Sequence, residues 1–400
     1  MHLEDGTREL AGVLALDDPA ANGRYRAEFR YEENWLKSKH GFALDPESLP
    51  LSRGIFAGSN LNPPLGVFND ALPDRWGRAL LLHGLPLSQR SDLLLLKLRG
   101  RNGLGSIEFI ENGIRLAPPN PESTLVLETL LDAAEKFEAG ISVEDSRLRR
   151  LLAAGTTAGG ARPKATVSDE MGDWIVKFPS KVLDGRFDMI GLEHATMDCA
   201  RAAGMKVPET RIEYIGAKKV IFVKRFDVAE RGGRHHMISL STLCKERSDY
   251  NVSSYDDLAD AIRKHSTDPS DDLARLFTHA VFNGLVGNTD DHLKNFAMLH
   301  DFSGYRLSPA YDLLPDTSAN QEHVLFYGNQ RFIDSRTTVI DMARRWGVAN
   351  PIGILRDVVD GLSEFKKYSE RSGVPGANVA EIMRDVERRI GRVAATVATD

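Results

Sequence analysis

The segment Gly287-Asn288-Thr289-Asp290-Asp291-His292-Leu293-Lys294-Asn295-Phe296 holds the densest group of chemically active side chains in the sequence. Asn295 follows Asp290 by five positions, and Asp312 comes after an intervening turn at 301–304. Phosphoryl transfer needs such a set: one carboxylate accepts the proton of the attacking hydroxyl, while an amide oxygen and a second carboxylate hold Mg²⁺ against the nucleotide phosphates. This spacing therefore indicates phosphoryl-transfer chemistry.

The same residues also suit a polar loop without catalytic function. Asp290 could cap a turn and Asn295 could bond the backbone, as Asp and Asn commonly do in loops. The strand-like segments 296–299 and 305–307 predict a hairpin that returns Asp312 towards Asn295. That return favours the phosphoryl-transfer interpretation.

A lysine upstream lies in the apolar strand-like segment 174–178. Lys177 could bind nucleotide phosphates and pair with Glu193 in the first turn of a predicted helix over 191–203. It could equally be an edge-strand lysine whose ammonium reaches water. A glutamate at a helix start is also favoured by the helix dipole alone.

A glycine-rich segment, 155–164, precedes the first of these strands. It has neither the G-x4-G-K-[ST] pattern of a P-loop nor G-x-G-x-x-G, yet its backbone N–H groups and Lys164 could cover phosphates. A surface loop is the alternative interpretation. Further on, 222–227 would be the hinge that meets the adenine edge, or simply a strand between domains.

The elements that must position these residues fall into a β-rich opening module, a small mixed lobe and a larger helical lobe. Two strands at 12–16 and 25–31 predict a hairpin, and Asp74 is a predicted N-cap for a helix over 75–83. A linker is expected at 117–121. The remaining predicted elements are a helix over 123–137, strands at 164–167, 174–178, 210–214 and 220–223, and helices with apolar stripes at 273–281 and 382–397.

Composition places the chain among ordinary globular proteins. Its 400 residues suggest two to three domains, and the net charge of −6 argues against holding nucleic acid by bulk electrostatics. Its two cysteines, Cys199 and Cys244, cannot form a disulfide framework, so a reducing cytosolic compartment is expected. No signal peptide or membrane-spanning segment is expected.

The sequence resembles the HipA family, serine/threonine kinases that act as toxins in bacterial toxin–antitoxin pairs. The T-D-x-H-x-K-N motif is present at 289–295 and the Y-D motif at 311–312. The opening module is similar to the HipA N-terminal subdomain at 72–77 and 103–109. The resemblance covers nearly the whole chain.

The resemblance implies ATP and Mg²⁺ as cofactors and assigns roles to individual residues. Asp290 would be the catalytic base, and Asn295 and Asp312 the Mg²⁺ ligands. Residues expected to bind the nucleotide are Gly159, Gly160, Ala161, Arg162, Pro163, Lys164, Lys177, Lys224, Arg225, Phe226, His292, Leu293, Lys294, Asn295, Tyr311 and Asp312. The family's loop often reads G-A-Q-E-K, where this chain has an Arg-Pro pair at 162–163. Because relatives autophosphorylate a hydroxyl residue in this loop, Thr157 and then Thr156 are the expected sites.

The implied fold is α+β and kinase-like, with two lobes (a small mixed lobe and a large all-α lobe) and a β-rich HipA N-terminal subdomain. The expected domains are 1–112, a linker and helix at 113–147, the small lobe at 148–228 and the large lobe at 229–400. The expected partners are a protein substrate such as an aminoacyl-tRNA synthetase or translation factor, and a HipB-like helix-turn-helix antitoxin, with DNA bound only through that antitoxin.

Three other functions fit parts of the pattern. A small-molecule phosphotransferase would share every ATP-binding residue. A non-catalytic partner of an antitoxin would keep a nucleotide site that has lost its activity. A metal hydrolase using Asp290, Asp291 and His292 is less favoured, because adjacent residues do not easily converge on one ion.

Overall fold

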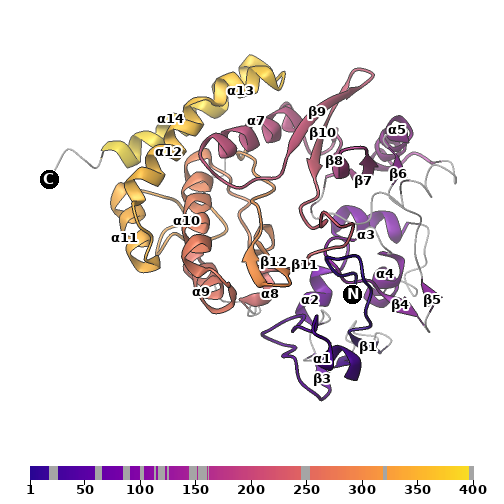
Figure 1. Ribbon diagram of the computed structural model, residues 1–400. Helices are drawn as coiled ribbons and strands as arrows, with labels where there is room; N and C mark the ends of the chain where they lie inside the picture. The colour runs from indigo at the N-terminus through magenta and orange to yellow at the C-terminus, as the bar shows by residue number, and fades with distance from the viewer. Residues whose placement is uncertain are drawn as a thin grey trace. The chain divides into compact units, whose positions relative to one another are not determined.

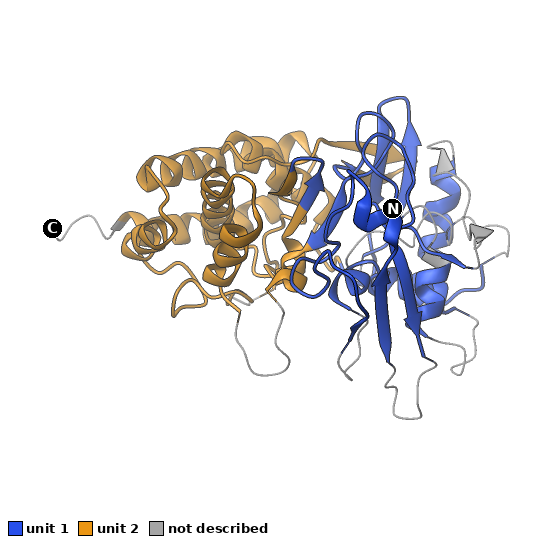
Figure 2. Ribbon diagram, turned by 60° about the horizontal axis from the view of Figure 1, so that its bottom comes forward, with its two compact units in different colours: residues 1–183, 224–238, 299–303 blue, residues 184–223, 239–298, 304–400 orange. Residues whose placement is uncertain are grey.

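The computed structural model describes residues 1–17, 26–58, 65–83, 91–99, 103–111, 114–115, 122–123, 126–143, 151, 160, 162–244, 253–318 and 322–395. The chain divides into two compact units, which Figure 2 shows in different colours. Unit 1 comprises 1–183, 224–238 and 299–303, and unit 2 comprises 184–223, 239–298 and 304–400. The chain therefore passes between the units several times.

Unit 1 opens with the predicted hairpin. Strands β1 (Gly12–Leu16) and β2 (Ala27–Tyr31) pair antiparallel, and β3 (Phe56–Ala57) extends the sheet. Phe29 and Tyr31 are buried on one face of β2 with ring centroids 4.9 Å apart. The period of two along the strand places these aromatic side chains together on the core face.

Short helices and strands make up the middle of unit 1. Helix α3 begins at Arg75 as predicted, because the Asp74 side chain accepts a hydrogen bond from the Gly77 amide. The helix predicted from Ser123 begins only at Leu127, since Ser123 pairs in strand β6. The elements here are α1 (Glu33–Lys37), α2 (Gly66–Asp70), α3 (Arg75–Leu81), α4 (Asp92–Arg99), β4 (Ile110–Glu111), β5 (Ile114–Arg115), β6 (Glu122–Ser123) and α5 (Leu127–Glu138).

The last part of unit 1 is a small sheet. Strands β7 (Lys164–Asp169) and β8 (Gly172–Lys177) pair antiparallel, and β6 joins β7 in parallel. Val167, Trp174 and Val176 are fully buried. These strands confirm the two predicted at 164–167 and 174–178.

Unit 2 is mainly helical. The strands predicted at 210–214 and 220–223 are confirmed as β9 and β10, and the structure shows that they pair antiparallel. Strands β10, β11 and β12 each run from one unit into the other. The elements of this part of the chain are α7 (Met189–Ala202), β9 (Thr210–Ile215), β10 (Lys218–Lys224), β11 (His236–Ser239), α8 (Leu240–Leu243), α9 (Tyr255–His265), α10 (Pro269–Val286), the 3-10 turn η4 (Leu293–Asn295), β12 (Ala297–Asp301), β13 (Gly304–Leu307), α11 (Arg336–Trp346), α12 (Pro351–Ser363), α13 (Phe365–Arg371) and α14 (Gly376–Ala395).

Helix α10 is the centre of unit 2. It contacts α9, α11, α12 and α14, which lie around it in Figure 1. Its predicted apolar stripe is confirmed, with Leu276, Phe277 and Ala280 fully buried. Asp268 caps the start of the helix and Gly287 ends it with φ +80°, a left-handed conformation that glycine adopts readily.

Among the described residues, no helix is both long and apolar enough to cross a membrane.

Candidate active site

The predicted catalytic segment leaves the C-terminal end of α10. A side chain at Gly287 would collide with the Arg389 guanidinium, because a Cβ there would lie 2.3 Å from its Cζ. Arg389 also donates to the Val286 carbonyl at 3.2 Å. Glycine therefore suits residue 287 for two reasons, the left-handed turn and the close approach of the Arg389 side chain.

Asp290 is the most accessible acid of the segment, with a side chain that is 82% exposed. Partial removal of water from its carboxyl raises its pKa. The ring of His292, with Nε2 3.8 Å from Oδ1, opposes this shift, and the carboxylates of Asp312, Asp291 and Asp316 raise the pKa further. An accessible carboxylate with a raised pKa is suited to accept a proton from a hydroxyl group.

Asn295 lies at the end of η4, where its amide is fixed by the loop itself. Its Nδ2 donates to the backbone oxygen of Asp290 at 2.7 Å. The amide oxygen is then the end of Asn295 that can bind a cation. The predicted pair of Asp290 and Asn295 is brought together by this bond.

Asp312 follows β13 and has φ +53°, in the left-handed region that Asp and Asn tolerate better than most residues. Its backbone oxygen accepts from Asn288 Nδ2 at 3.4 Å. Beside it, the Tyr311 hydroxyl donates to the Lys294 carbonyl at 2.9 Å. The structure therefore brings the Y-D segment back to the catalytic segment, as the predicted hairpin requires.

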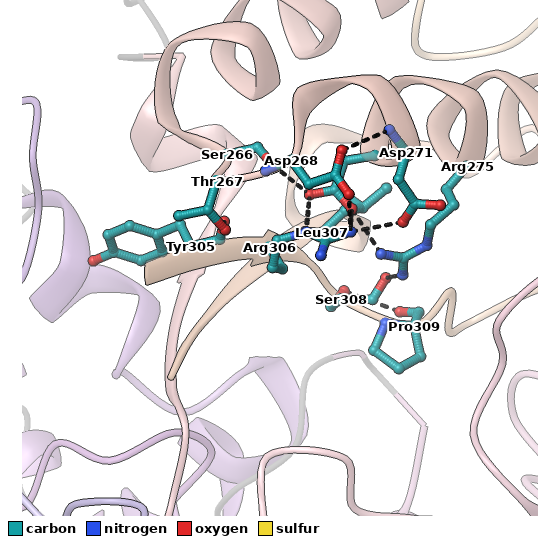
Figure 3. Close-up of polar contacts among 11 residues, drawn as sticks. Ser266, Thr267, Asp268, Asp271, Arg275, Tyr305, Arg306, Leu307, Ser308 and Pro309 are labelled. Carbon is teal, nitrogen blue, oxygen red and sulfur yellow. Dashed lines mark hydrogen bonds and ion pairs between the residues drawn. The ribbon is translucent and has the colours of Figure 1, made fainter. Parts of the chain in front are cut away.

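The strand that leads to Asp312 is held on the first half of α10 (Figure 3). Asp272 is fully buried, and its Oδ2 accepts from the Leu307 amide at 2.9 Å and from Arg306 Nε at 3.0 Å. Arg275 bonds the Ser308 carbonyl at 2.9 Å. One helix thus carries the catalytic segment at its end and anchors the return strand near its start.

Asp291 is a residue whose role the sequence alone did not reveal. Its fully buried carboxylate accepts from the Tyr255 hydroxyl at 2.8 Å, from His323 Nδ1 at 2.9 Å and from the Val324 amide at 2.9 Å. Burying a carboxylate without such partners would be costly. Asp291 therefore anchors the backbone next to Asp290 and cannot join it at one ion, contrary to the hydrolase alternative.

A chain of buried amides continues from this anchor. Asn283 donates to the Tyr255 hydroxyl at 3.1 Å, and Asn288 donates to Asn283 at 3.1 Å and to the Asp312 backbone. The sequence shows only common loop and helix residues here. In the folded chain their hydrogen bonds connect the loop that holds Asp291 with the backbone of Asp312.

Asp316 is a further acidic residue that no motif marks. It accepts from the Thr289 hydroxyl at 2.5 Å, and its amide donates to the Gly287 carbonyl at 2.8 Å. Thr289 of the T-D motif therefore donates a hydrogen bond to Asp316, and this bond helps to fix the loop.

The oxygen donors of Asn295 and Asp312 fit Mg²⁺, which is commonly bound by one or two protein oxygens together with substrate phosphates. Within the described residues no group of three or more His, Cys, Asp or Glu side chains could hold a metal ion on its own. The donor set thus suits a metal that arrives with a nucleotide.

In unit 1 the two lysines predicted to bind phosphate are cross-strand partners. Lys164 of β7 lies directly opposite Lys177 of β8. Side chains directly opposite in an antiparallel pair lie on the same face, with Cβ atoms about 5 Å apart. The sheet register therefore places two ammonium-bearing residues side by side.

Lys164 is buried and paired with an acid from the N-terminal module. Its Nζ lies 3.0 Å from Asp74 Oδ2, and the side chains are 2% and 9% exposed. Among the other residues predicted for this loop, Gly160, Arg162 and Pro163 are described. Gly159, Ala161, Thr156 and Thr157 lie outside the described residues.

The predicted hinge residues have unequal surroundings. The Arg225 side chain is fully buried in a two-bond ion pair with Asp227, and it also donates to the Gly103 carbonyl at 2.8 Å. Its amide donates to the Asp173 carbonyl, so a nucleotide contact would have to use the Arg225 carbonyl. Lys224 Nζ lies 5.7 Å from the centre of the Trp174 ring.

Other predicted residues differ in exposure. Leu293 is buried, so a nucleotide could reach only its backbone, whereas Lys294 is exposed. Glu193 is buried in α7.

Two protein families match the chain. The family described as HipA-like C-terminal domain matches residues 156–394, and the family described as HipA N-terminal domain matches residues 7–110. Together they cover most of both units.

Similar proteins are found in bacteria. The chain is 25% identical to "Putative kinase Y4mE" of Sinorhizobium fredii over 72% of this chain and 71% of that protein. It is 23% identical to "Serine/threonine-protein kinase toxin HipA" of Shewanella oneidensis over 78% and 74% of the two chains. A solved structure of HipA from Shewanella oneidensis, in complex with HipB and operator DNA, matches with a TM-score of 0.69 and 19% identity over 97% of each chain. The fold is therefore the mixed α+β, kinase-like fold of that protein, with β-rich N-terminal sheets and a helical C-terminal region.

Proposed function

The chain belongs to the HipA family of kinases, and on that premise we propose that it transfers the γ-phosphate of Mg-ATP to a serine or threonine hydroxyl of a cytosolic protein. We take a component of the translation machinery, such as an aminoacyl-tRNA synthetase or a translation factor, as the expected target. Phosphorylation of such a target would arrest growth. The functional domains in this proposal are 1–112, 113–147, 148–228 and 229–400, with a small mixed lobe and a large helical lobe.

The observation that carries the proposal is the arrangement around Asp290. Its accessible carboxylate has a raised pKa, Asn295 is bonded to its backbone, and Asp312 is close enough to influence its titration. In the proposed reaction Asp290 orients the substrate hydroxyl and accepts its proton. Asn295 and Asp312 would hold Mg²⁺, which would neutralise the charge of the phosphates, while ATP would supply the γ-phosphoryl group and ADP would leave.

The residues proposed to bind the nucleotide include a pair of lysines. Lys164 and Lys177 provide positive charge on one face of a strand pair. The other residues proposed to contact it are Gly159, Gly160, Ala161, Arg162, Pro163, Lys224, Arg225, Phe226, His292, Leu293, Lys294 and Tyr311.

We also propose a HipB-like helix-turn-helix protein as the antitoxin of this chain. The similar HipA of Shewanella oneidensis was solved with HipB and operator DNA, which supports a partner of this type. Because this chain carries a net charge of −6, DNA contact is expected to come mainly from the partner. Tight, salt-sensitive binding of the isolated chain to operator DNA would contradict this part of the proposal.

The experiment that tests the proposal compares wild type with Asp290→Asn. Asn295 binds the backbone of residue 290, so this substitution leaves that hydrogen bond in place. We expect induced wild type to arrest bacterial growth, the helix-turn-helix protein of the neighbouring gene to relieve the arrest, and Asp290→Asn to be harmless. Phosphoproteomics after induction should reveal protein targets that are absent with Asp290→Asn. Transfer of phosphate to a metabolite and to no protein would overturn the proposal.

A further inference from the structure

Asp74 uses its two carboxylate oxygens for two different tasks. Oδ1 accepts from the Gly77 amide at 2.7 Å and so caps α3. Oδ2 lies 3.0 Å from the ammonium of Lys164, ninety positions further along the chain. The cap alone needs only one oxygen, and Ser or Asn would supply it as well. The choice of a charged cap is therefore explained by the second contact.

The negative charge of Asp74 compensates the buried ammonium of Lys164. Lys164 is only 2% exposed and has Lys177 directly opposite it in the strand pair. Like charges directly opposite each other destabilise a strand pair, and a buried ammonium is costly unless it is paired. Asp74 satisfies the buried ammonium of Lys164 and offsets its repulsion from Lys177.

The ammonium also lies close to Gly160. Gly160 has φ +109°, and a Cβ at this position would be 2.9 Å from Lys164 Nζ. A glycine therefore lets the backbone come close to the ammonium. Asp74 Oδ2 and the Gly160 backbone are therefore both close neighbours of Lys164 Nζ.

We propose that Asp74 is a positioning residue for nucleotide binding, which acts by holding the Lys164 ammonium in place for a phosphate group. This inference rests on the proposed function, since it assumes that Lys164 takes part in binding Mg-ATP. It gives the N-terminal module, to which Asp74 belongs, a direct part in the affinity of the kinase for its nucleotide.

The test is a double-mutant cycle on the purified full chain, with Mg-ATP affinity measured by calorimetry. Asp74→Asn keeps a side-chain oxygen for the α3 cap but removes the charge, and Lys164→Met removes the ammonium while keeping much of the apolar stem. Each should weaken Mg-ATP binding roughly tenfold, in line with the loss of one charge-assisted hydrogen bond. The double variant should be no weaker than either single variant, because the two residues act as one unit.

Unit 2 offers a matched control. Asp188 caps α7 by accepting from the Gly191 amide at 3.0 Å, and its other oxygen lies 2.5 Å from Lys219 Nζ. Asp188→Asn therefore removes the same kind of charged cap, but its lysine partner is not among the residues proposed to bind the nucleotide. Its Mg-ATP affinity should equal that of wild type, although it should lower the melting temperature about as much as Asp74→Asn does.

The possible results separate the two hypotheses. Wild type that binds no Mg-ATP would overturn the proposed function and this inference with it. Wild type that binds Mg-ATP while Asp74→Asn binds it equally well or more tightly would overturn the inference alone. Equal weakening by Asp74→Asn and Asp188→Asn would also overturn it, because the effect would then reflect general loss of stability.

Discussion

Asp290 and Asp291 are adjacent in the sequence, yet the first side chain is 82% exposed and the second is fully buried. The buried carboxylate is held by Tyr255 and His323 and by backbone amides of the segment after residue 322. The Asp290 carboxylate lies at the surface of the loop, and Asp291 anchors that loop. Asp290 is therefore accessible for the proposed proton transfer, while Asp291 anchors the backbone beside it.

Asp291→Asn should damage both stability and phosphate transfer. An amide in place of the carboxylate would bring an NH₂ group against donors, including the Val324 amide, at a buried position. We expect a loss of about 3 kcal/mol in the free energy of unfolding and a fall in kcat at saturating Mg-ATP. Urea unfolding and transfer assays below the unfolding range check this.

The control for that experiment is Asp198→Asn. Asp198 is also a buried carboxylate, but its partners are Arg201 and Arg371 on α7 and α13. It should lose stability with kcat unchanged. Equal kcat in wild type and folded Asp291→Asn would show that Asp291 does not position the loop.

Asp312→Asn should abolish phosphate transfer and weaken Mg-ATP binding while the fold stays intact. Asn tolerates the left-handed conformation at residue 312, where φ is +53°, so the backbone strain of other substitutions is avoided. Circular dichroism verifies the fold, and titration with Mg-ATP measures the affinity. Normal transfer by a folded Asp312→Asn protein would refute the assignment of Asp312 as a Mg²⁺ ligand.

Arg225→Met should destabilise unit 1 by about 3 to 5 kcal/mol, since it leaves a buried carboxylate without its partner. Burial by itself raises the pKa of Asp227, but the Arg225 guanidinium, the charge of Arg234 and the Gly105 amide together lower it by more, so this acid is charged in the folded protein. Replacing both residues, in Arg225→Met/Asp227→Leu, should recover much of the lost stability. Urea unfolding measures both, and a double variant less stable than Arg225→Met would contradict this account.

Stability should decrease in mild acid because of His279. Burial first, and the nearby charge of Arg275 second, lower the pKa of His279 to about 3. An unfolded histidine titrates near about 6.5, so between these values the unfolded chain binds a proton that the folded chain does not. The stability contributed by neutral His279 is present above pH about 6.5 and is lost as the pH falls towards 3.

His279→Phe tests this titration. The ring of His279 lies 4.6 Å from that of Phe296, so phenylalanine keeps an aromatic contact there. The slope of the unfolding free energy between pH about 4 and 6.5 should be smaller by about one proton in the variant. Identical slopes in wild type and variant would rule out the contribution of His279.

Thr157, or else Thr156, should carry phosphate in active protein. A phosphate would add about −1.5 to −2 charge beside a site for a polyanion, and its repulsion from ATP should push the loop away and switch the kinase off. Mass spectrometry of wild type and Asp290→Asn checks the modification. The prediction would be contradicted if neither threonine is modified in active enzyme. It would also be contradicted if protein phosphorylated at Thr157 binds ATP as tightly as unmodified protein does.

Sequence reasoning succeeded where a feature depends on residues close together in the chain. The Asp74 cap, the β1–β2 hairpin and the return from β12 through β13 were all predicted, because caps and turns are set by covalent geometry over a few residues. The T-D-x-H-x-K-N segment was recognised as a phosphoryl-transfer candidate for the same reason, since its spacing is visible in the sequence.

Only the tertiary structure decided which partner each buried charge takes. Asp74 was predicted as a cap, but its contact with Lys164 spans ninety positions and exists only because folding brings the start of α3 close to the start of β7. Arg225 was expected to meet the nucleotide through its backbone, and the structure adds that its side chain is paired with Asp227. A buried charge must find an opposite charge or a hydrogen-bonding partner, and which one is available depends on the segments that folding brings together, so spacing along the chain could not predict it.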